Sequence, residues 1–316
     1  MFHPPTAITI LRAVQFQKIT IVGVGLLGGS LGLAAKHRRL AREVAGYVRR
    51  EASVKDCLKA GAVDYATTDL LAAVSNADLI ILCTPLAQMR LLVKQMMPAL
   101  KRGAIVTDVG SAKAGVVKDL ESLVAKSGAH FVGSHPMAGA EKTGVGSARA
   151  DLFECAMCVV TPTKRTNRAA LRNVEKFWQN VGCRLLRLTP EAHDALVSRS
   201  SHLPHLVAAA LAATVLDPRR PKEQAALCAN GFRDTTRVAS GSPEMWRDIA
   251  LANRAQLRVA LDEFVRELQA VQALLRGRTP QLKFRSTDAA ALQEFFATAK
   301  ARRDSWRAGC VSSSPE

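Results

Sequence analysis

Apolar residues in the first two-thirds of the chain form short continuous runs, separated by longer segments in which apolar positions have a helical spacing. The runs lie at residues 18–23, 44–48, 77–83, 104–108, 131–133, 157–161 and 184–188. Runs without alternating polar residues are typical of parallel strands that are covered on both faces. The helical segments lie at residues 26–37, 54–60, 86–100, 112–127 and 167–181. This alternation predicts a doubly wound, Rossmann-type α/β domain with a parallel sheet.

The pattern changes near Pro190, after which helical periodicity dominates at residues 191–216, 222–229, 243–275 and 288–307. We therefore expect an N-terminal extension (residues 1–16), a dinucleotide-binding domain (17–188), an all-helical domain (189–307) and a disordered tail (308–316). Residues 206–216 (LVAAALAATVL) are apolar on every side, which is typical of a helix that packs against another surface. We expect the helical domain to form a homodimer.

Composition narrows the class of protein. Hydrophobic residues make up 48% of the 316 residues and charged residues 22%, which excludes a disordered chain. The net charge of +17 invites a nucleic-acid interpretation, but the basic residues are spread along the chain and no basic run is interleaved with aromatic residues. We expect no nucleic-acid partner and interpret the charge as a solvated surface that attracts small anions.

The apolar runs and the cysteines bear on the cellular compartment of the protein. The longest apolar stretch, at residues 206–216, is too short to cross a membrane, and the N-terminus lacks the pattern of a signal peptide. The seven cysteines are expected to be reduced thiols of a cytoplasmic protein. We expect no metal site, because the lone pair Cys155 and Cys158 enters a predicted strand, and His202 and His205 lack a third ligand.

A glycine-rich segment, G-V-G-L-L-G, directly follows the first predicted strand and opens a helix. Gly23 permits a tight turn, Gly25 lets the backbone approach a pyrophosphate, and Gly28 lets the helix pack closely on the strand. Leu26 and Leu27 begin the helix, whose N-terminal amides and dipole favour an anion. The context predicts a dinucleotide site; the alternative is a glycine-rich turn without a ligand.

The end of the second predicted strand bears on the choice of cofactor. An Asp or Glu about 20 residues after the glycines binds the ribose of NAD in such folds, whereas an Arg accommodates the 2′-phosphate of NADP. Here Val48 is followed by Arg49 and Arg50, and Glu51 comes later. We therefore predict NADP, with NAD still possible; the alternative is that both arginines are solvated charges.

Polar residues cluster where other predicted strands end, at the edge where such sheets bind ligands. Thr84 and Pro85 close the strand at residues 77–83 and are expected to contact the cofactor. Ser111 lies in the segment DVGSAK after a strand, and His135 lies in GSHPMAGAEK, where Pro136 is expected to fix a turn. A histidine in this place can serve as a general base or as a structural hydrogen-bond partner.

Five segments together resemble the prephenate/arogenate dehydrogenase family of tyrosine biosynthesis, in the family's order and over about residues 18–275. They are GVGLLGGSLGLA, DVGSAK, GSHPMAGAEKTGV, SHLPHLVA and GFRDTTRVASGSPEMWRDI. The resemblance implies an oxidoreductase that removes a hydride from C4 of a cyclohexadienol ring and releases the ring carboxylate as CO2. It also implies a small-molecule substrate bound in the cleft between the two domains.

The resemblance assigns roles to individual residues. His135 matches the catalytic histidine that accepts the proton of the C4 hydroxyl, and Ser111 matches the serine that orients it and meets the cofactor. The remaining matches concern the substrate: Arg237 for a carboxylate, His205 for the side chain, Trp246 near the ring and Glu141 as a gating acid.

The loop that follows His135 bears on the choice of substrate. Val145 and Gly146 follow Gly144, and no acid appears until Asp151, whereas arogenate-selective relatives often place an acid there for the ammonium group. We therefore predict oxidation of prephenate to 4-hydroxyphenylpyruvate. The alternatives are an arogenate dehydrogenase, a dual-specificity cyclohexadienyl dehydrogenase and, more remotely, a β-hydroxyacid-type reductase or a nucleotide-sensing protein.

Overall fold

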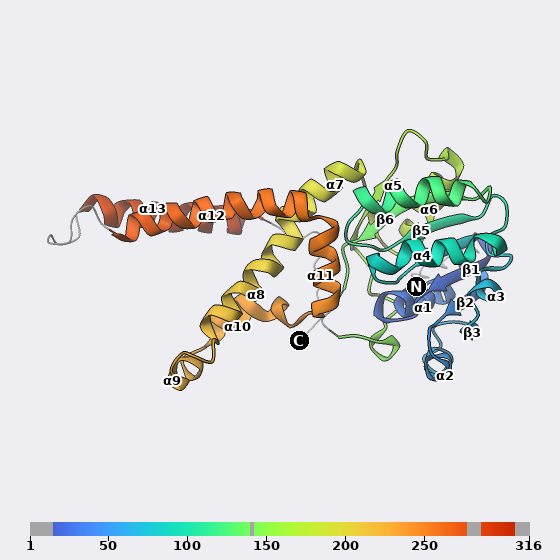
Figure 1. The fold of residues 1–316 in the computed structure, drawn as a ribbon, viewed down its shortest axis with the longest axis horizontal. Helices are drawn as coiled ribbons and strands as arrows, with labels where there is room; N and C mark the ends of the chain where they lie inside the picture. The colour runs from blue at the N-terminus through green and yellow to red at the C-terminus, as the bar shows by residue number, and fades with distance from the viewer. Residues whose placement is uncertain (1–14, 140–141, 277–285, 307–316) are drawn as a thin grey trace, which may run out of the picture. The chain divides into compact units, whose positions relative to one another are not determined.

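The structure is a computed structural model that describes residues 15–139, 142–276 and 286–306. It divides into two compact units, Met1–His193 and Asp194–Glu316 (Figure 1). The boundary that the sequence predicts, between residues 188 and 189, lies shortly before this division. The predicted tail, and all but the last two residues of the predicted extension, lie outside the described residues.

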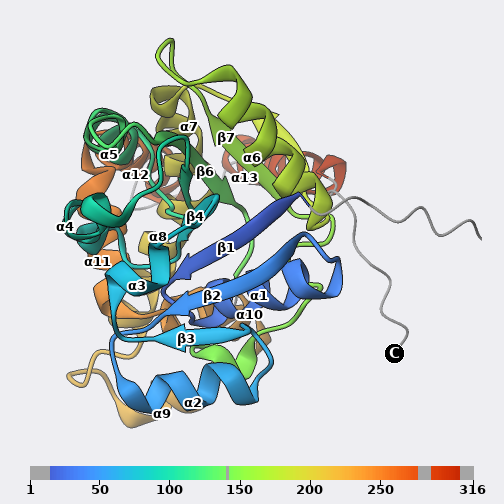
Figure 2. The ribbon, with the colours of Figure 1, turned by 90° about the vertical axis from the view of Figure 1, so that its right-hand side faces the viewer.

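The first unit contains an eight-stranded sheet in the order β3-β2-β1-β4-β5-β6-β7-β8. The strands are β1 (Phe16–Val22), β2 (Ala41–Tyr47), β3 (Tyr65–Thr67), β4 (Leu79–Leu82), β5 (Ile105–Asp108), β6 (His130–Pro136), β7 (Met157–Thr161) and β8 (Arg184–Arg187). Strands β3, β2, β1 and β4 lie side by side in Figure 2. Strand β3 and the short helix that follows it were not predicted from the sequence.

The pairing of β6 with β7 differs from the all-parallel prediction. Strands β1 to β6 pair in parallel, but β6 and β7 are antiparallel, with His135 opposite Val159. A parallel return needs a crossover, usually a helix. The described part of the connection between β6 and β7 contains only the 3-10 helix η2 (Val145–Ser147), so the chain re-enters the sheet from the same end.

Helices cover both faces of this sheet, as a doubly wound fold requires. Helices α1 (Leu26–His37) and α6 (Arg168–Asn180) pack with Ile19 and Ile21 in one apolar core. Helices α3 (Leu70–Val74), α4 (Leu86–Met96) and α5 (Ala114–Ala125) pack with Ile80 and Leu82 in the other. Helix α2 (Glu51–Lys59) follows β2 and contributes Cys57 to the first core.

The second unit is helical, but its helices are more broken than the sequence predicts. The expected helix at residues 191–216 is divided into α7 (Pro190–Val197), the π-helical turn η3 (Ser198–His202) and α8 (Leu203–Val215). The expected helix at 243–275 breaks at Asn253 into α11 (Pro243–Ala252) and α12 (Arg254–Arg276). Asn253 there donates from its side-chain amide to the Asp194 carbonyl, a contact that no sequence pattern encodes.

Shorter helices complete this unit: α9 (Lys222–Ala226), α10 (Asn230–Thr236), the 3-10 helix η4 (Arg237–Ser240) and α13 (Ser286–Ser305). Its apolar residues remain largely exposed, and the buried ones among its described residues are Val197, Ala208, Ile249, Leu257 and Ala260. Helix α8 is apolar all round, yet only Ala208 of its residues is buried. Helices of this kind are normally covered on all sides.

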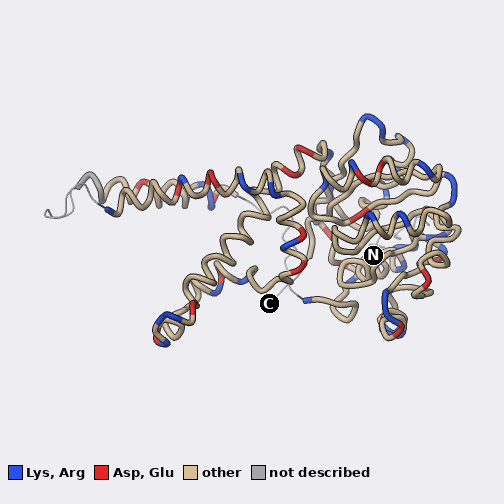
Figure 3. The backbone as a smooth tube through the Cα atoms, in the orientation of Figure 1, with Lys and Arg blue, Asp and Glu red and all other residues tan. Residues whose placement is uncertain are grey.

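Charge and hydropathy complete the description. Lys and Arg residues are distributed along both units rather than collected in one run (Figure 3). Over the described ranges, none of the helices combines the length and the apolar character that a membrane crossing needs.

Candidate active site

The loop between β1 and α1 has the geometry of a dinucleotide-binding turn. Gly23 has a φ of +98°, and a Cβ on it would lie 2.8 Å from the Cys83 carbonyl oxygen. A Cβ on Gly28 would lie 2.1 Å from the Gly23 oxygen, so this position packs α1 onto the loop. A Cβ on Gly25 would meet nothing within 4 Å, and Gly25 caps α1 without a side-chain hydrogen bond. Open space in front of uncapped helix amides suits a pyrophosphate.

A cavity of about 360 Å³ adjoins this loop. Its walls come from the segments after β1, β2 and β4 and from residues 144 and 145; they include Gly23, Gly25, Arg49, Arg50, Thr84 and Pro85. Strands β1 and β4 are neighbours at the point where the strand order reverses, which is where open α/β sheets bind ligands. The residues present therefore fit a dinucleotide. Leu26, Leu27, Gly28 and Ser111, although predicted to bind the cofactor, are not among its lining residues.

The rim of the cavity carries the two arginines. Arg49 and Arg50 are exposed and lie between β2 and α2. The carboxylate of Glu51 accepts a hydrogen bond from the Thr68 hydroxyl at 2.5 Å, so this acid is already engaged. The sequence did not single out Ser53 and Asp56, which also line the cavity and belong to the first turns of α2.

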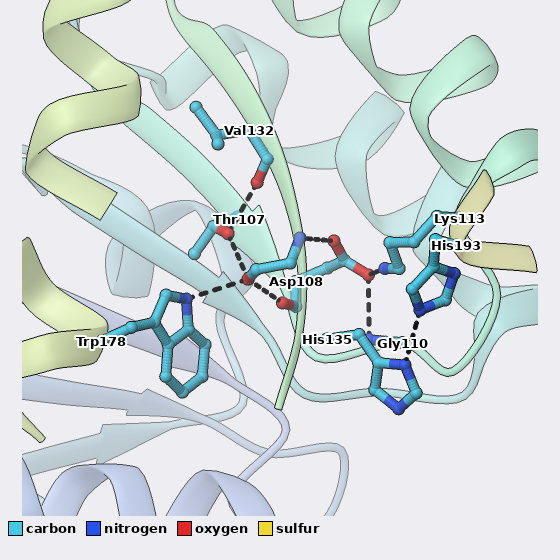
Figure 4. A network of polar contacts seen from close by, with 9 residues as sticks. Thr107, Asp108, Gly110, Lys113, Val132, His135, Trp178 and His193 are labelled. Atoms are coloured by element: carbon cyan, nitrogen blue, oxygen red, sulfur yellow. Dashed lines mark hydrogen bonds and ion pairs between the residues drawn. The ribbon is translucent and has the colours of Figure 1, made fainter. Parts of the chain in front are cut away.

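A buried polar network lies at the ends of β5 and β6 (Figure 4). Asp108 forms an ion pair with Lys113, and neither side chain is exposed. The Asp108 carboxylate also accepts from the Gly110 amide at 2.9 Å and from the Ser134 amide at 3.1 Å. Ser111, half-buried, lies between Gly110 and Lys113 in the chain and is therefore bracketed by two groups that Asp108 holds.

Ser134 links this network to α6. Its hydroxyl donates to the Asp108 carbonyl at 2.6 Å, and it accepts from the Trp178 indole at 3.0 Å. The Thr107 hydroxyl lies 2.8 Å from the Ser134 hydroxyl oxygen and donates to the Val132 carbonyl. Ser134, the residue that precedes His135, is thus held both by β5 and by α6.

His135 lies within β6 rather than after the strand, which corrects the sequence prediction, and its side chain is 6% exposed. Pro136 ends the strand instead of forming a separate turn. The Nδ1 atom of His135 lies 2.8 Å from Nε2 of His193, a completely buried residue of α7 (Figure 4). The sequence prediction missed His193, whose only signal was its place in the segment EAHD just after the last strand.

Three aromatic rings cluster in the second unit. The Trp246 ring stacks on His205 with centroids 3.6 Å apart and an angle of 27° between the planes. His202 meets Trp246 edge-on at 6.3 Å. His205 Nδ1 lies 3.0 Å from the Ser201 carbonyl, while His202 Nδ1 lies 3.2 Å from the Asn253 amide. The π-helical turn η3 ends at His202, and such turns are frequent at functional sites.

The other two predicted substrate residues are placed differently. Arg237 is the first residue of η4 and its side chain is exposed. Glu141 lies outside the described residues. Within the described ranges, no three His, Cys, Asp or Glu side chains are grouped so as to hold a metal ion.

Two thiols line the cavity without contributing a negative charge. Burial, reinforced by the nearby Asp108 carboxylate, raises the pKa of Cys83 far above its ordinary range. Burial and the adjacent Asp56 likewise raise the pKa of Cys57. Both groups therefore stay protonated and inert at neutral pH.

Comparison with known proteins decides the family. The nucleotide-binding domain of prephenate dehydrogenase matches residues 31–187, and the dimerization domain of prephenate dehydrogenase matches residues 189–297. The chain belongs to the prephenate dehydrogenase family. This confirms the expected oxidoreductase class, and it confirms the doubly wound domain followed by a helical one.

Individual members of the prephenate dehydrogenase family agree. The prephenate dehydrogenase of Bacillus subtilis is 34% identical over 90% of this chain and 75% of its own length. The cyclohexadienyl dehydrogenase of Zymomonas mobilis is 34% identical over 83% of this chain and 90% of its own. The crystal structure of prephenate dehydrogenase from Aquifex aeolicus, in complex with hydroxyphenyl propionate and NAD+, has a TM-score of 0.83 and 32% identity, covering 92% of this chain and 99% of that one.

Proposed function

We propose that this protein oxidises prephenate to 4-hydroxyphenylpyruvate and CO2, with NADP+ as the hydride acceptor. The observation that carries the proposal is the placement of His135. It is a buried histidine at the ligand-binding edge of a dinucleotide-binding sheet, and its Nδ1 is hydrogen-bonded to His193. Family membership supplies the reaction class.

In this proposal His135 acts as a general base and then as an acid. A bound nicotinamide cofactor would supply the acceptor for the hydride that leaves C4 of the substrate. His135 accepts the C4 hydroxyl proton at the same time, so that the oxygen becomes a carbonyl. The C–C bond to the ring carboxylate then breaks, its electrons make the ring aromatic, and His135 returns its proton to the phenolate oxygen. Ser111 orients the hydroxyl and the histidine.

The helical unit supplies groups suited to the rest of the substrate. The guanidinium of Arg237 is suited to a bidentate pair with a carboxylate. The stacked pair of His205 and Trp246 offers a flat apolar face beside a polar ring nitrogen, which fits a keto-acid side chain next to a ring. Glu141 retains its proposed role as a gating acid.

NADP is favoured over NAD by the residues after β2. Arg49 and Arg50 line the cavity, and the nearest acid, Glu51, is bonded to Thr68. Two guanidiniums suit a phosphate, whereas a ribose diol is normally met by a carboxylate. The relative from Aquifex aeolicus was crystallised with NAD+ and not NADP+. The proposed preference for NADP+ therefore rests on Arg49 and Arg50 and not on that relative.

Prephenate is favoured over arogenate by the loop after His135. Asp151 is the first acid after Glu141, and its carboxylate lies 3.3 Å from the Arg149 guanidinium. An acid that is already paired is poorly suited to binding a substrate ammonium group. The similarity to a cyclohexadienyl dehydrogenase keeps dual specificity as the second candidate.

We also propose a homodimer formed by the helical unit. Leu251, Val259, Leu268 and Leu275 on α11 and α12 are each at least 42% exposed, and in α8 only Ala208 is buried. The matching family domain is a dimerization domain. For the compartment we propose the cytoplasm, since Cys57, Cys83, Cys158, Cys183 and Cys228 are free thiols.

The test is a cofactor-reduction assay with prephenate and arogenate side by side, each with NAD+ and NADP+. We expect the highest kcat/KM with prephenate and NADP+. His135→Asn should lower kcat by about 10²- to 10⁴-fold while NADP+ binding is retained. His130→Asn, the same substitution at the start of β6, is the matched control and should keep the parent rate. Turnover by the His135 variant at the parent rate would refute the proposed base.

A further inference from the structure

The strongest unassigned feature of the molecule is the contact between two histidines from different elements. His135 comes from β6 and His193 from α7, 58 residues later in the chain. Their ring centroids are 5.1 Å apart, and the planes are inclined by 67°. We infer that His193 is a positioning residue that holds His135 in the tautomer with its hydrogen on Nδ1. This inference rests on the proposed function and adds a residue to it.

The distance between the two nitrogens restricts the hydrogens they carry. His135 Nδ1 and His193 Nε2 lie 2.8 Å apart, which is a hydrogen bond with one hydrogen between them. Two N–H groups facing each other at this distance would repel, and two bare nitrogens would gain nothing. Both rings are buried, so water cannot screen the repulsion. The pair therefore holds at most one positive charge.

One hydrogen leaves two arrangements, and they predict opposite chemistry. If His193 donates, His135 as a neutral ring carries its hydrogen on Nε2 and cannot accept a proton there. If His135 donates from Nδ1, its Nε2 has a lone pair for the substrate hydroxyl. The proposed function needs the second arrangement. His193 must then be neutral, with its own hydrogen on Nδ1.

In this arrangement His193 does what a carboxylate does beside other catalytic histidines: it fixes the tautomer and steadies the charged form. Once His135 has taken the substrate proton, its Nδ1–H becomes a charge-assisted donor to a neutral acceptor, which is a stronger bond than before. The proton therefore stays within the pair until the phenolate takes it back.

The surroundings hold both rings in place. His193 donates its backbone amide to the Thr189 carbonyl at 2.9 Å, and its side chain is completely buried. His135 follows Ser134, which Asp108 and Trp178 fix, and pairs with Val159 across the sheet. A side chain this enclosed cannot change rotamer without a cavity or a clash. The fold thus presents Nε2 of His193 to Nδ1 of His135.

Two substitutions of His193 distinguish the effect of its hydrogen-bond acceptor from the effect of its side-chain volume. His193→Phe keeps a ring but removes the acceptor, and we expect kcat with prephenate and NADP+ to fall about 30-fold, with both KM values within about twofold of the parent. His193→Gln can place its amide oxygen near the position of Nε2, and it should regain activity to within about fivefold of the parent. Glu191→Gln, on the exposed side of the same helix, is the matched control and should keep the parent kcat.

A second readout does not depend on turnover. NMR of the unliganded parent labelled in its histidines reports which ring nitrogen carries hydrogen, and spectra of His135→Asn and His193→Phe assign the signals. We expect hydrogen on Nδ1 of both His135 and His193. Hydrogen on Nε2 of His135 with a bare Nδ1 would overturn the inference, as would equal kcat losses in the Phe and Gln variants or a Phe variant with the parent kcat. If the parent oxidises neither substrate, the proposed function fails, and the NMR result still decides the tautomer.

Discussion

Asp108 and Lys113 form an ion pair in which both side chains are completely buried. The same carboxylate accepts from the backbone amides of Gly110 and Ser134, so it joins the end of β5 to β6. Ser111 and His135 each follow directly after one of the anchored residues. The pair therefore shapes the segments that carry the predicted catalytic groups, although neither member is assigned a part in the chemistry.

Removing one member of this ion pair should destabilise the fold. Lys113→Met leaves a buried carboxylate with no cation, and we expect the free energy of unfolding to fall by about 3–5 kcal/mol. Adding Asp108→Asn should restore at least about 1 kcal/mol, because the uncompensated charge is then gone. Urea unfolding measures both. Lys118→Met, at an exposed position of α5, is the control and should change stability by less than about 0.5 kcal/mol. A Lys113 variant as stable as that control would contradict this account.

Two glycines of the nucleotide loop should separate folding from cofactor binding. A Cβ on Gly28 would lie 2.1 Å from backbone, so Gly28→Ala should destabilise the fold by several kcal/mol or prevent it. A Cβ on Gly25 meets nothing within 4 Å, but it would occupy the space proposed for the pyrophosphate. Gly25→Ala should therefore unfold nearly as the parent does and bind NADPH about 10- to 100-fold more weakly. Thermal unfolding and fluorescence titration test the contrast; equal NADPH affinity in the Gly25 variant and the parent would count against the site.

Most of the fold could be predicted from local patterns in the sequence. Continuous apolar runs identified the sheet because strands buried on both faces have no polar alternation, and β4 (Leu79–Leu82) is completely buried. Strand β3 was missed because three residues are too few to show a period. The antiparallel step at β7 depends on the path of an irregular connection, which periodicity does not encode. The break at Asn253 depends on a bond to Asp194, far away in the sequence.

The candidate site divides in the same way. Gly23, Gly25 and the two arginines could be placed beside the cavity because they follow closely after predicted strands. His135 was singled out from its neighbours, but its partner His193 lies 58 residues away and only the folded chain brings the two rings together. Lys113 was visible within DVGSAK, yet nothing in the sequence indicated that its charge would be buried against Asp108.

Arg49 and Arg50 should set the choice of cofactor. Replacing both by Ala removes the charges proposed to bind the 2′-phosphate, and we expect the KM for NADP+ to rise about 10- to 100-fold. The KM for NAD+, which lacks that phosphate, should change by less than about threefold. Steady-state kinetics with both cofactors test this. Arg42→Ala, exposed on β2, is the control and should leave the ratio unchanged. Equal changes for the two cofactors in the double variant would mean that these arginines act only as surface charge.

Asp78 should make the stability of the fold depend on pH in the acid range. Burial favours its neutral form, but the hydrogen bond with Lys101 and those from the Gln17 and Lys18 amides together outweigh burial and lower the pKa below its ordinary value of 3.8. A carboxyl whose pKa is lower in the folded state stabilises the fold fully above the unfolded value. That contribution is lost as the pH falls through the folded value.

Asp78→Asn should therefore reduce the free energy of unfolding by roughly 1–2 kcal/mol at pH 7, since the charged bonds between β1, β4 and Lys101 are weakened. The gap between variant and parent should shrink steadily below about pH 4, because the parent then loses the same charge. Urea unfolding at a series of pH values from neutral to acid measures the gap. Asp119→Asn, on the exposed face of α5, should leave stability within about 0.5 kcal/mol throughout. A gap for Asp78→Asn that stays constant into the acid range would show that its carboxylate charge contributes nothing to the fold.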